Sequence, residues 1–178
     1  MIFRLSQKLG SKIKAGVLAA AALDENPYVD WSAHVFSIKR AQYILLSNTE
    51  SLYSCVMSGA GITSTRLFIE RALTTIRELL EQDGLSSVYR DFIAPSSGTV
   101  RFAKALNRSV IGSMTELILS VESGLTENSV SLPDVGMGLN DLLLSYLGTT
   151  RSDRYNRPSV AFRRLAARIP SNEGTTET

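Results

Sequence analysis

The sequence predicts an α+β fold in which a small, mostly antiparallel sheet of about four or five strands packs against several helices. Two observations lead to this prediction: short runs rich in aromatic and β-branched residues come first, and apolar patterns at a spacing of three and four residues follow them. The composition agrees, since 178 residues with 44% hydrophobic and 20% charged side chains are enough to form a hydrophobic core. We expect a single domain over residues 1–169 and a disordered polar tail over residues 170–178.

The first third of the chain is predicted to supply most of the strands. A helical turn over residues 8–13 follows the first strand, and a loop that contains Asn26-Pro27 precedes the second. The last three runs are joined by short polar segments, so we expect them to form an antiparallel meander. The predicted strands of this region are residues 2–5, 31–38, 43–47 and 52–57.

The rest of the chain is predicted to be mainly helical. The most regular helix spans residues 67–80, after the capping candidates Thr63 and Ser64 and before Gly84. Asn107 is placed to cap a second long helix. Residues 133–138, which contain proline and glycine, are expected to break the chain. The remaining predictions are a helix over residues 86–93, a strand over 99–103, and helices over 139–147 and 159–168.

The net charge is only +2, with 19 Lys and Arg against 17 Asp and Glu, but the basic residues are unevenly placed. Such a small excess does not indicate a broad nucleic-acid-binding surface. Since no aromatic platform is interleaved with the C-terminal basic segment, we favour a solvated helix face there and keep nucleic-acid contact as the less favoured alternative. The arginines of this segment are Arg151, Arg154, Arg157, Arg163, Arg164 and Arg168.

A single cysteine, Cys55, excludes an intramolecular disulfide and suits a reducing compartment, so we expect a cytoplasmic protein. The alanine-rich run over residues 15–23 follows basic residues, but it is too weakly hydrophobic for us to favour a signal peptide. We expect no membrane association, because no apolar stretch is long enough to span a bilayer. One histidine and one cysteine give little support for a metal site, and no cofactor is expected.

His34 is the only histidine, and it lies on a predicted strand four residues after Asp30. A general base held by a carboxylate would need such a pair. Alternation along the strand places His34 on the same face as Ser32 and Phe36, which favours a partly buried structural histidine over a catalytic one.

A second candidate site surrounds the start of the helix that Asn107 is predicted to cap. Free backbone amides of the first turn, the Arg108 guanidinium and the Ser109 hydroxyl, with Ser113 one turn further on, could bind an anion or a carboxylate. The alternative, which we favour, is that these side chains cap the helix and pair with acidic neighbours.

Three motifs give the sequence a family resemblance. The chain opens with Met-x-x-Arg-x-Ser-x-Lys-Leu, continues with Asp-Trp-Ser-Ala-His at residues 30–34, and carries Asn-Arg-Ser-Val-x-Gly-Ser-Met at residues 107–114. By these motifs it resembles a bacterial family of conserved proteins of unknown function, over most of residues 1–165. It departs from the family at Thr115-Glu116, where Asn-Asp is usual. The resemblance implies a bacterial origin but no active site.

These observations favour a non-catalytic ligand-binding or protein-interaction domain, because the sequence lacks a P-loop, GxSxG, GxGxxG or HExxH motif. Two alternatives stay open: a small enzyme that uses Asp30 and His34 with Arg108 and Ser109 on an anionic substrate, and nucleic-acid binding through the C-terminal arginines. The partner is not identified by the sequence; another protein or a small anionic ligand would fit.

Overall fold

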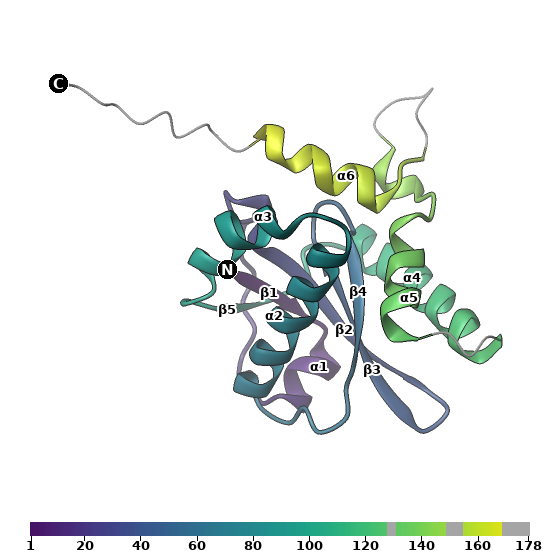
Figure 1. Ribbon diagram of the computed structural model, residues 1–178. Coiled ribbons are helices and arrows are strands. Elements are labelled where there is room, and N and C mark those ends of the chain that lie inside the picture. The colour runs from purple at the N-terminus through teal and green to yellow at the C-terminus, as the bar shows by residue number, and fades with distance from the viewer. Residues whose placement is uncertain (128–130, 149–154, 169–178) are drawn as a thin grey trace.

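A five-stranded mixed sheet forms the centre of the computed structural model, which describes residues 1–127, 131–148 and 155–168 (Figure 1). The strand order is β4-β3-β2-β1-β5. The antiparallel meander is confirmed, while β1 is parallel to both of its neighbours. Most paired residues lie in the antiparallel ladders, and the α+β class is confirmed. The strands are β1 (Ile2–Leu5), β2 (Asp30–Ile38), β3 (Ala41–Asn48), β4 (Ser54–Ser58) and β5 (Arg101–Lys104).

Helices cover both faces of the sheet (Figure 1). One face packs against α1 and α2, and the side chain of Phe162 from α6 completes the same core cluster. The other face packs against α4 and α5. A short α3 (Ser86–Val88) continues into a wider turn over Tyr89–Ile93. The longer helices are α1 (Gln7–Lys12), α2 (Thr65–Gln82), α4 (Arg108–Glu127), α5 (Leu132–Asn140) and α6 (Pro158–Arg164).

Alternation along β2 separates the two cores. Trp31 and Val35 point into the core beneath α2, whereas Phe36 points into the core beneath α4. Asp30 and His34 share the face of Phe36. The predicted face of His34 therefore agrees with the observed strand register.

The predicted helix caps are present. The Ser64 hydroxyl accepts a hydrogen bond from the backbone N–H of Leu67, and the Asn107 side chain accepts one from the N–H of Val110 at 3.0 Å. Gly84 follows α2 with a φ of +70°, the left-handed conformation that ends a helix at little cost for glycine.

The expected break at residues 133–138 is wrong, because α5 spans this segment. Pro133 occupies the first turn, where its missing N–H removes no intrahelical hydrogen bond, and the Ser131 hydroxyl caps the helix. The helix predicted over residues 139–147 is also wrong, since α5 ends at Asn140 and only a 3₁₀ turn, Ser145–Leu147, follows. The tail predicted over residues 170–178 lies outside the described residues.

Helix α5 lies against β4, an edge strand of the sheet. The Asn140 side chain accepts a hydrogen bond from the N–H of Ser54 at 2.7 Å and donates one to the Ser54 carbonyl at 2.9 Å. It thereby takes the place of a further strand at this point of the edge. Gly136 faces β4, since a Cβ there would lie 3.6 Å from the Cα of Cys55, at ordinary contact distance.

Candidate functional site

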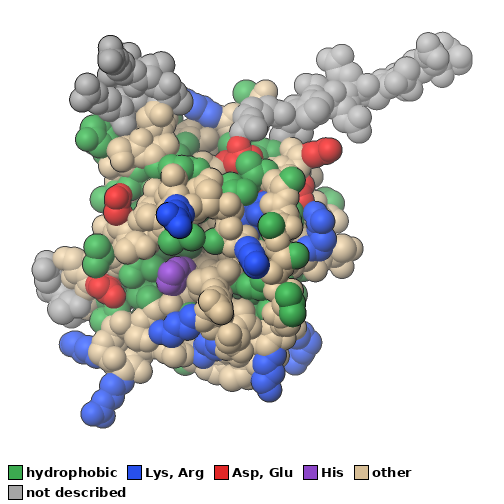
Figure 2. All heavy atoms as spheres, turned by 180° about the vertical axis from the view of Figure 1, so that it is seen from behind, with side chains coloured by type: hydrophobic (Ala, Val, Ile, Leu, Met, Phe, Trp, Pro, Cys, Tyr) green, Lys and Arg blue, Asp and Glu red, His purple; other side chains and the backbone are tan. Residues whose placement is uncertain are grey.

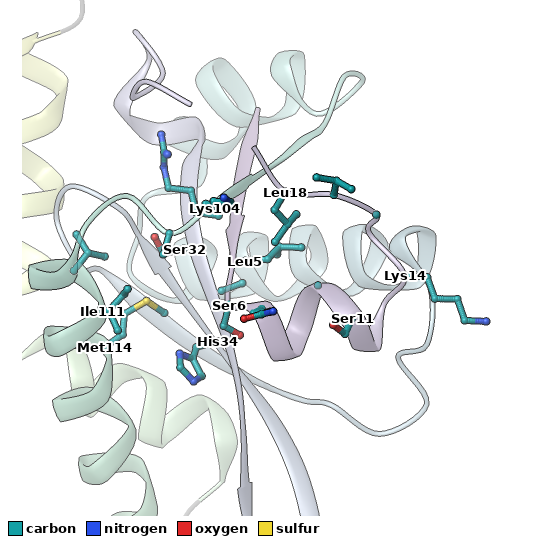
Figure 3. A pocket seen from close by; sticks show the side chains of 18 residues that line it. Leu5, Ser6, Ser11, Lys14, Leu18, Ser32, His34, Lys104, Ile111 and Met114 are labelled. Atoms are coloured by element: carbon teal, nitrogen blue, oxygen red, sulfur yellow. The ribbon is translucent and has the colours of Figure 1, made fainter. Parts of the chain in front are cut away.

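A cavity of about 810 Å³ opens where β1 and β5 end (Figure 3). Its floor is formed by the middle of β2, from Ser32 to His34. One wall comes from α1 and the segment that follows it, and the opposite wall comes from the first two turns of α4. The cavity therefore lies between elements that are distant in the sequence.

The position of the cavity follows from the topology. Strands β1 and β5 are adjacent and parallel, so their C-terminal ends lie at the same side of the sheet. After β1, the side chains of Leu9 and Ile13 are buried in the core on one face of the sheet. After β5, those of Val110 and Met114 are buried in the core on the other face. In open sheets, a crevice between neighbouring parallel strands whose helices lie on opposite faces is the usual place for a ligand.

The side chains that line the cavity combine apolar, hydroxyl and basic groups. The charged or titratable ones are all basic, and no aspartate or glutamate is among the residues described at the lining. The apolar group includes Leu18, Val110, Ile111 and Met114, the hydroxyl group Ser6, Ser11 and Ser32, and the basic group Arg4, Lys14, His34 and Lys104.

Arg4 is fully committed to structural contacts. Its Nε and Nη2 donate to the two carboxylate oxygens of Asp30, both at 2.7 Å, and both side chains are almost completely buried. Its Nη1 donates to the carbonyl of Ala21 at 2.9 Å, and Nη2 also donates to that of Ala22 at 2.8 Å. Residues 15–24, which we call the strap, are thus tied to the sheet beside the cavity. Since Asp30 neutralises it, Arg4 adds little net charge there.

His34 lies half-buried on the cavity floor. Figure 3 shows its ring on the side of the cavity where Met114 of α4 also lies, and Figure 2 shows the histidine at the surface with hydrophobic side chains beside it. Burial lowers the pKa of His34, and the positive charge of Lys8 lowers it further. At neutral pH the ring is therefore uncharged and offers one hydrogen-bond donor and one acceptor.

The comparison with known families agrees with the resemblance noted in the sequence. The family model of a domain of unknown function, DUF6933, matches residues 2–161. The chain belongs to this family. The match includes every strand and every residue that lines the cavity in the DUF6933 domain. No curated protein and no solved structure matches the chain.

The predicted anion cluster of the DUF6933 domain is not part of the cavity. Asn107 caps α4, Arg108 and Ser109 are exposed, and Ser113 is buried. None of these four lines the cavity, although Val110 of the same helix does. Anion binding by the cluster stays a prediction.

The Asp30 carboxylate is occupied by other groups, so it does not serve as the partner of His34 that the catalytic hypothesis requires. Both of its carboxylate oxygens accept hydrogen bonds from Arg4, and Oδ2 also accepts one from the N–H of Asp24 at 3.1 Å. Asp30 therefore holds Arg4 and the strap. An enzyme hypothesis must rest on His34 without this carboxylate as its orienting partner.

The C-terminal arginines are only partly described. Arg151 and Arg154 lie outside the described residues. Arg157, Arg163 and Arg164 are exposed, and Nη2 of Arg163 donates to the Asp83 carbonyl at 3.1 Å, at the C-terminal end of α2. A basic side chain at a helix C-terminus is a stabilising contact. Nucleic-acid contact by this segment stays a prediction.

The described residues present neither a metal-binding cluster nor a membrane-spanning helix. Within the described ranges, no three side chains of the metal-ligating types lie together. Cys55 is buried, and burial raises the pKa of its thiol, with a smaller contribution from the charge of Glu78. No helix in the described part of the chain has the length and apolar character needed to cross a bilayer.

Sequence reasoning missed two basic residues of the cavity lining, the ion-paired Arg4 and Lys104. Arg4 interrupts a four-residue apolar run, and a charged side chain in such a run is a signal for a buried ion pair. Lys104 closes a short strand before a turn, a position at which nothing in the sequence distinguishes it from other exposed lysines.

Proposed function

We propose that this domain binds a small anionic ligand in the cavity between β1, β5 and α4. The observation that carries the proposal is the sign of the charge at the lining, where every titratable side chain is basic. Asp30 neutralises Arg4, and Figure 3 shows Lys14 directed away from the cavity. Lys104 is therefore the basic side chain of the lining that remains for a ligand. On the cavity floor, His34 is uncharged and the buried Ser32 hydroxyl is hydrogen-bonded to that of Thr49 at 2.9 Å.

The size and composition of the cavity support a small molecule as the occupant. Ligand pockets in proteins commonly have volumes of roughly 300 to 1,000 Å³, with mostly apolar walls and few polar groups. The cavity has about 810 Å³, and its walls present Leu18, Val110, Ile111 and Met114. Binding is favoured over catalysis because the Asp30 carboxylate is held by Arg4.

The single histidine provides a direct test. The imidazole resonances of His34 are followed by NMR while sets of carboxylates, phosphates, amines and neutral alcohols are added. We expect anions to shift them in a saturable way, and Lys104→Gln to weaken binding about tenfold, as for loss of a charged hydrogen bond. Lys39→Gln, in the exposed β2–β3 turn, is the matched control. The proposal fails if no anion binds, or if the two variants weaken binding equally.

We further infer a cytoplasmic location in a bacterium. The family resemblance supports the origin, and a single buried cysteine in the core, Cys55, is compatible with a reducing compartment. Fractionation of cells that express the full chain, followed by immunodetection, tests the location. Recovery in the periplasmic or membrane fraction would overturn it.

A further inference from the structure

We propose that the ligand is an amphipathic monocarboxylate, whose charged end meets Lys104 and whose apolar part is covered by Val17 of the strap and Ile111 of α4. This inference rests on the anion site proposed above and adds the class of ligand.

Val17 is 99% exposed, although it is apolar and lines the cavity. The backbone holds it outward, because Lys14 and Gly16 have φ angles of +58° and +75°, in the left-handed region. The next residue, Leu18, packs tightly against Gly10, where a Cβ would lie only 3.0 Å from Leu18 Cδ1. The strap is thus held before Val17 by the hydrogen bond from the N–H of Ala15 to the Gly10 carbonyl, and after it by Leu18. The Val17 side chain between them is left exposed to solvent.

The opposite wall carries a matching apolar surface. Ile111 is 41% exposed, while Met114 one turn further along α4 is 4% exposed and Val110 is fully buried. The apolar surface therefore continues from the mouth of the cavity into the core. A single exposed apolar residue needs no explanation, but Val17 and Ile111 line the same cavity, and each offers apolar area that a ligand can bury.

The charge of the lining favours one negative charge. Lys104 is a single point charge, His34 is neutral at pH 7, and Arg4 is already paired. A phosphate dianion or a dicarboxylate would leave charge without a partner in a partly apolar cavity. One carboxylate joined to an alkyl or aromatic group matches both the cation and the apolar walls.

A chain-length series tests the inference. Acetate, butyrate, hexanoate and octanoate are titrated into the full chain by calorimetry, with inorganic phosphate, succinate and 1-octanol as comparisons. We expect the affinity to rise about fourfold for each methylene that becomes buried, the factor that corresponds to ~0.8 kcal/mol. Octanoate should bind more tightly than phosphate, succinate and octanol.

Surface variants locate the apolar contact. Ile111→Ser and Val17→Ser should reduce the gain per methylene, whereas Leu119→Ser, at a 59% exposed position of the same helix outside the cavity lining, should leave it unchanged. All three positions are exposed, so folding is expected to be retained and is checked by circular dichroism. Lys104→Gln should weaken every carboxylate about equally, without a change in the gain per methylene.

The outcomes separate this inference from the proposed function. If carboxylates bind with an affinity that does not depend on chain length, or if phosphate or succinate binds best, the amphipathic class is wrong and the anion site stands. Equal effects of Ile111→Ser and Leu119→Ser would also overturn it. If no carboxylate and no phosphate binds, the anion site itself is wrong.

Discussion

The guanidinium of Arg4 and the carboxylate of Asp30 form a two-point ion pair between the parallel strands β1 and β2, with both N–O distances at 2.7 Å. The same guanidinium donates to the carbonyls of Ala21 and Ala22, and the Asp30 carboxylate accepts from the N–H of Asp24. One buried pair therefore joins two strands to the strap that borders the cavity. Its loss should affect stability and the cavity together.

Replacing Arg4 is expected to be strongly destabilising. Arg4→Met leaves the Asp30 carboxylate buried without its cation, a change that costs about 3–5 kcal/mol in the free energy of unfolding. Urea denaturation followed by circular dichroism measures the effect. The matched control is Arg66→Met, which breaks an exposed pair with Glu70 and should cost less than about 1 kcal/mol. Equal costs for the two variants would contradict the role assigned to Arg4.

His34 should make stability depend on pH in a defined direction. Its pKa is lowered in the folded state, so the unfolded chain binds more protons near the ordinary histidine pKa of about 6.5. The contribution of the neutral His34 ring to the free energy of unfolding is thus fully present above pH 6.5. It decreases as the pH falls from there toward the pKa of the folded state. Urea unfolding of the wild type and of His34→Gln at pH 7.5, 6.5 and 5.5 isolates it. We expect the wild type to lose more stability than the variant; parallel curves would contradict this.

Phe162 is expected to anchor α6 through an aromatic cluster. Its ring centroid lies 4.3 Å from that of Tyr53 and 4.9 Å from that of Tyr28, and the side chain is fully buried. Phe162→Ala should cost about 3–5 kcal/mol of unfolding free energy. Tyr155→Ala, at a 56% exposed position, is the control and should cost little. Trp31, the single tryptophan, lies 6.3 Å from Phe162, so its fluorescence should change in the first variant alone.

Cys55 is expected to be unreactive in the native state. It is 3% exposed, and burial raises the pKa of its thiol, so the nucleophilic thiolate is scarce. Iodoacetamide should label the thiol only through the unfolded state. Arg4→Met should therefore accelerate labelling by the factor by which it raises the unfolded population, about tenfold for each 1.4 kcal/mol of stability lost. Rapid labelling of the native wild type would contradict the burial.

The predictable parts of the fold are those encoded by local patterns. The caps at Ser64 and Asn107 and the apolar spacing of α2 are local, and the structure has them where the sequence places them. The central position of β1 depends on parallel pairing with β2 and β5, which are distant in the sequence, so a four-residue run does not reveal it. The segment of α5 has the proline and glycine content of a loop, and its helix is stabilised by packing on β4.

The candidate site was predictable only in part, for a similar reason. His34 is a candidate from the sequence because it is the only histidine, and it lies on the cavity floor. The helix start predicts an anion cluster at Asn107 and Arg108, but the side of α4 that lines the cavity is the one with Val110 and Ile111. Which side of a helix meets a cavity depends on how the helix packs on the sheet, and the sequence motif does not contain that information.

Asn140 provides the most specific test of how the edge of the sheet is protected. Its amide makes two hydrogen bonds with the backbone of Ser54 in β4, on the side opposite to β3. Asn140→Ala should leave both backbone groups without these partners, at a cost of about 1–3 kcal/mol for each buried group that stays unsatisfied. Asn140→Asp keeps the acceptor but sets a buried carboxylate oxygen against the carbonyls of Ser54 and Gly136, so a cost at least as large as that of Asn140→Ala is expected.

The same variant should also change association. An edge strand with free backbone groups pairs readily with another chain. In the wild type the Asn140 amide prevents such pairing at Ser54, because it occupies the backbone N–H and carbonyl of that residue. We therefore expect Asn140→Ala to form dimers or aggregates at protein concentrations at which the wild type keeps its own state, as measured by analytical ultracentrifugation. Asn26→Ala is the control, because it removes side-chain hydrogen bonds to the backbone of Tyr28 and Phe92 and none to β4. If both variants destabilise the fold but associate equally, edge protection is not the role of Asn140.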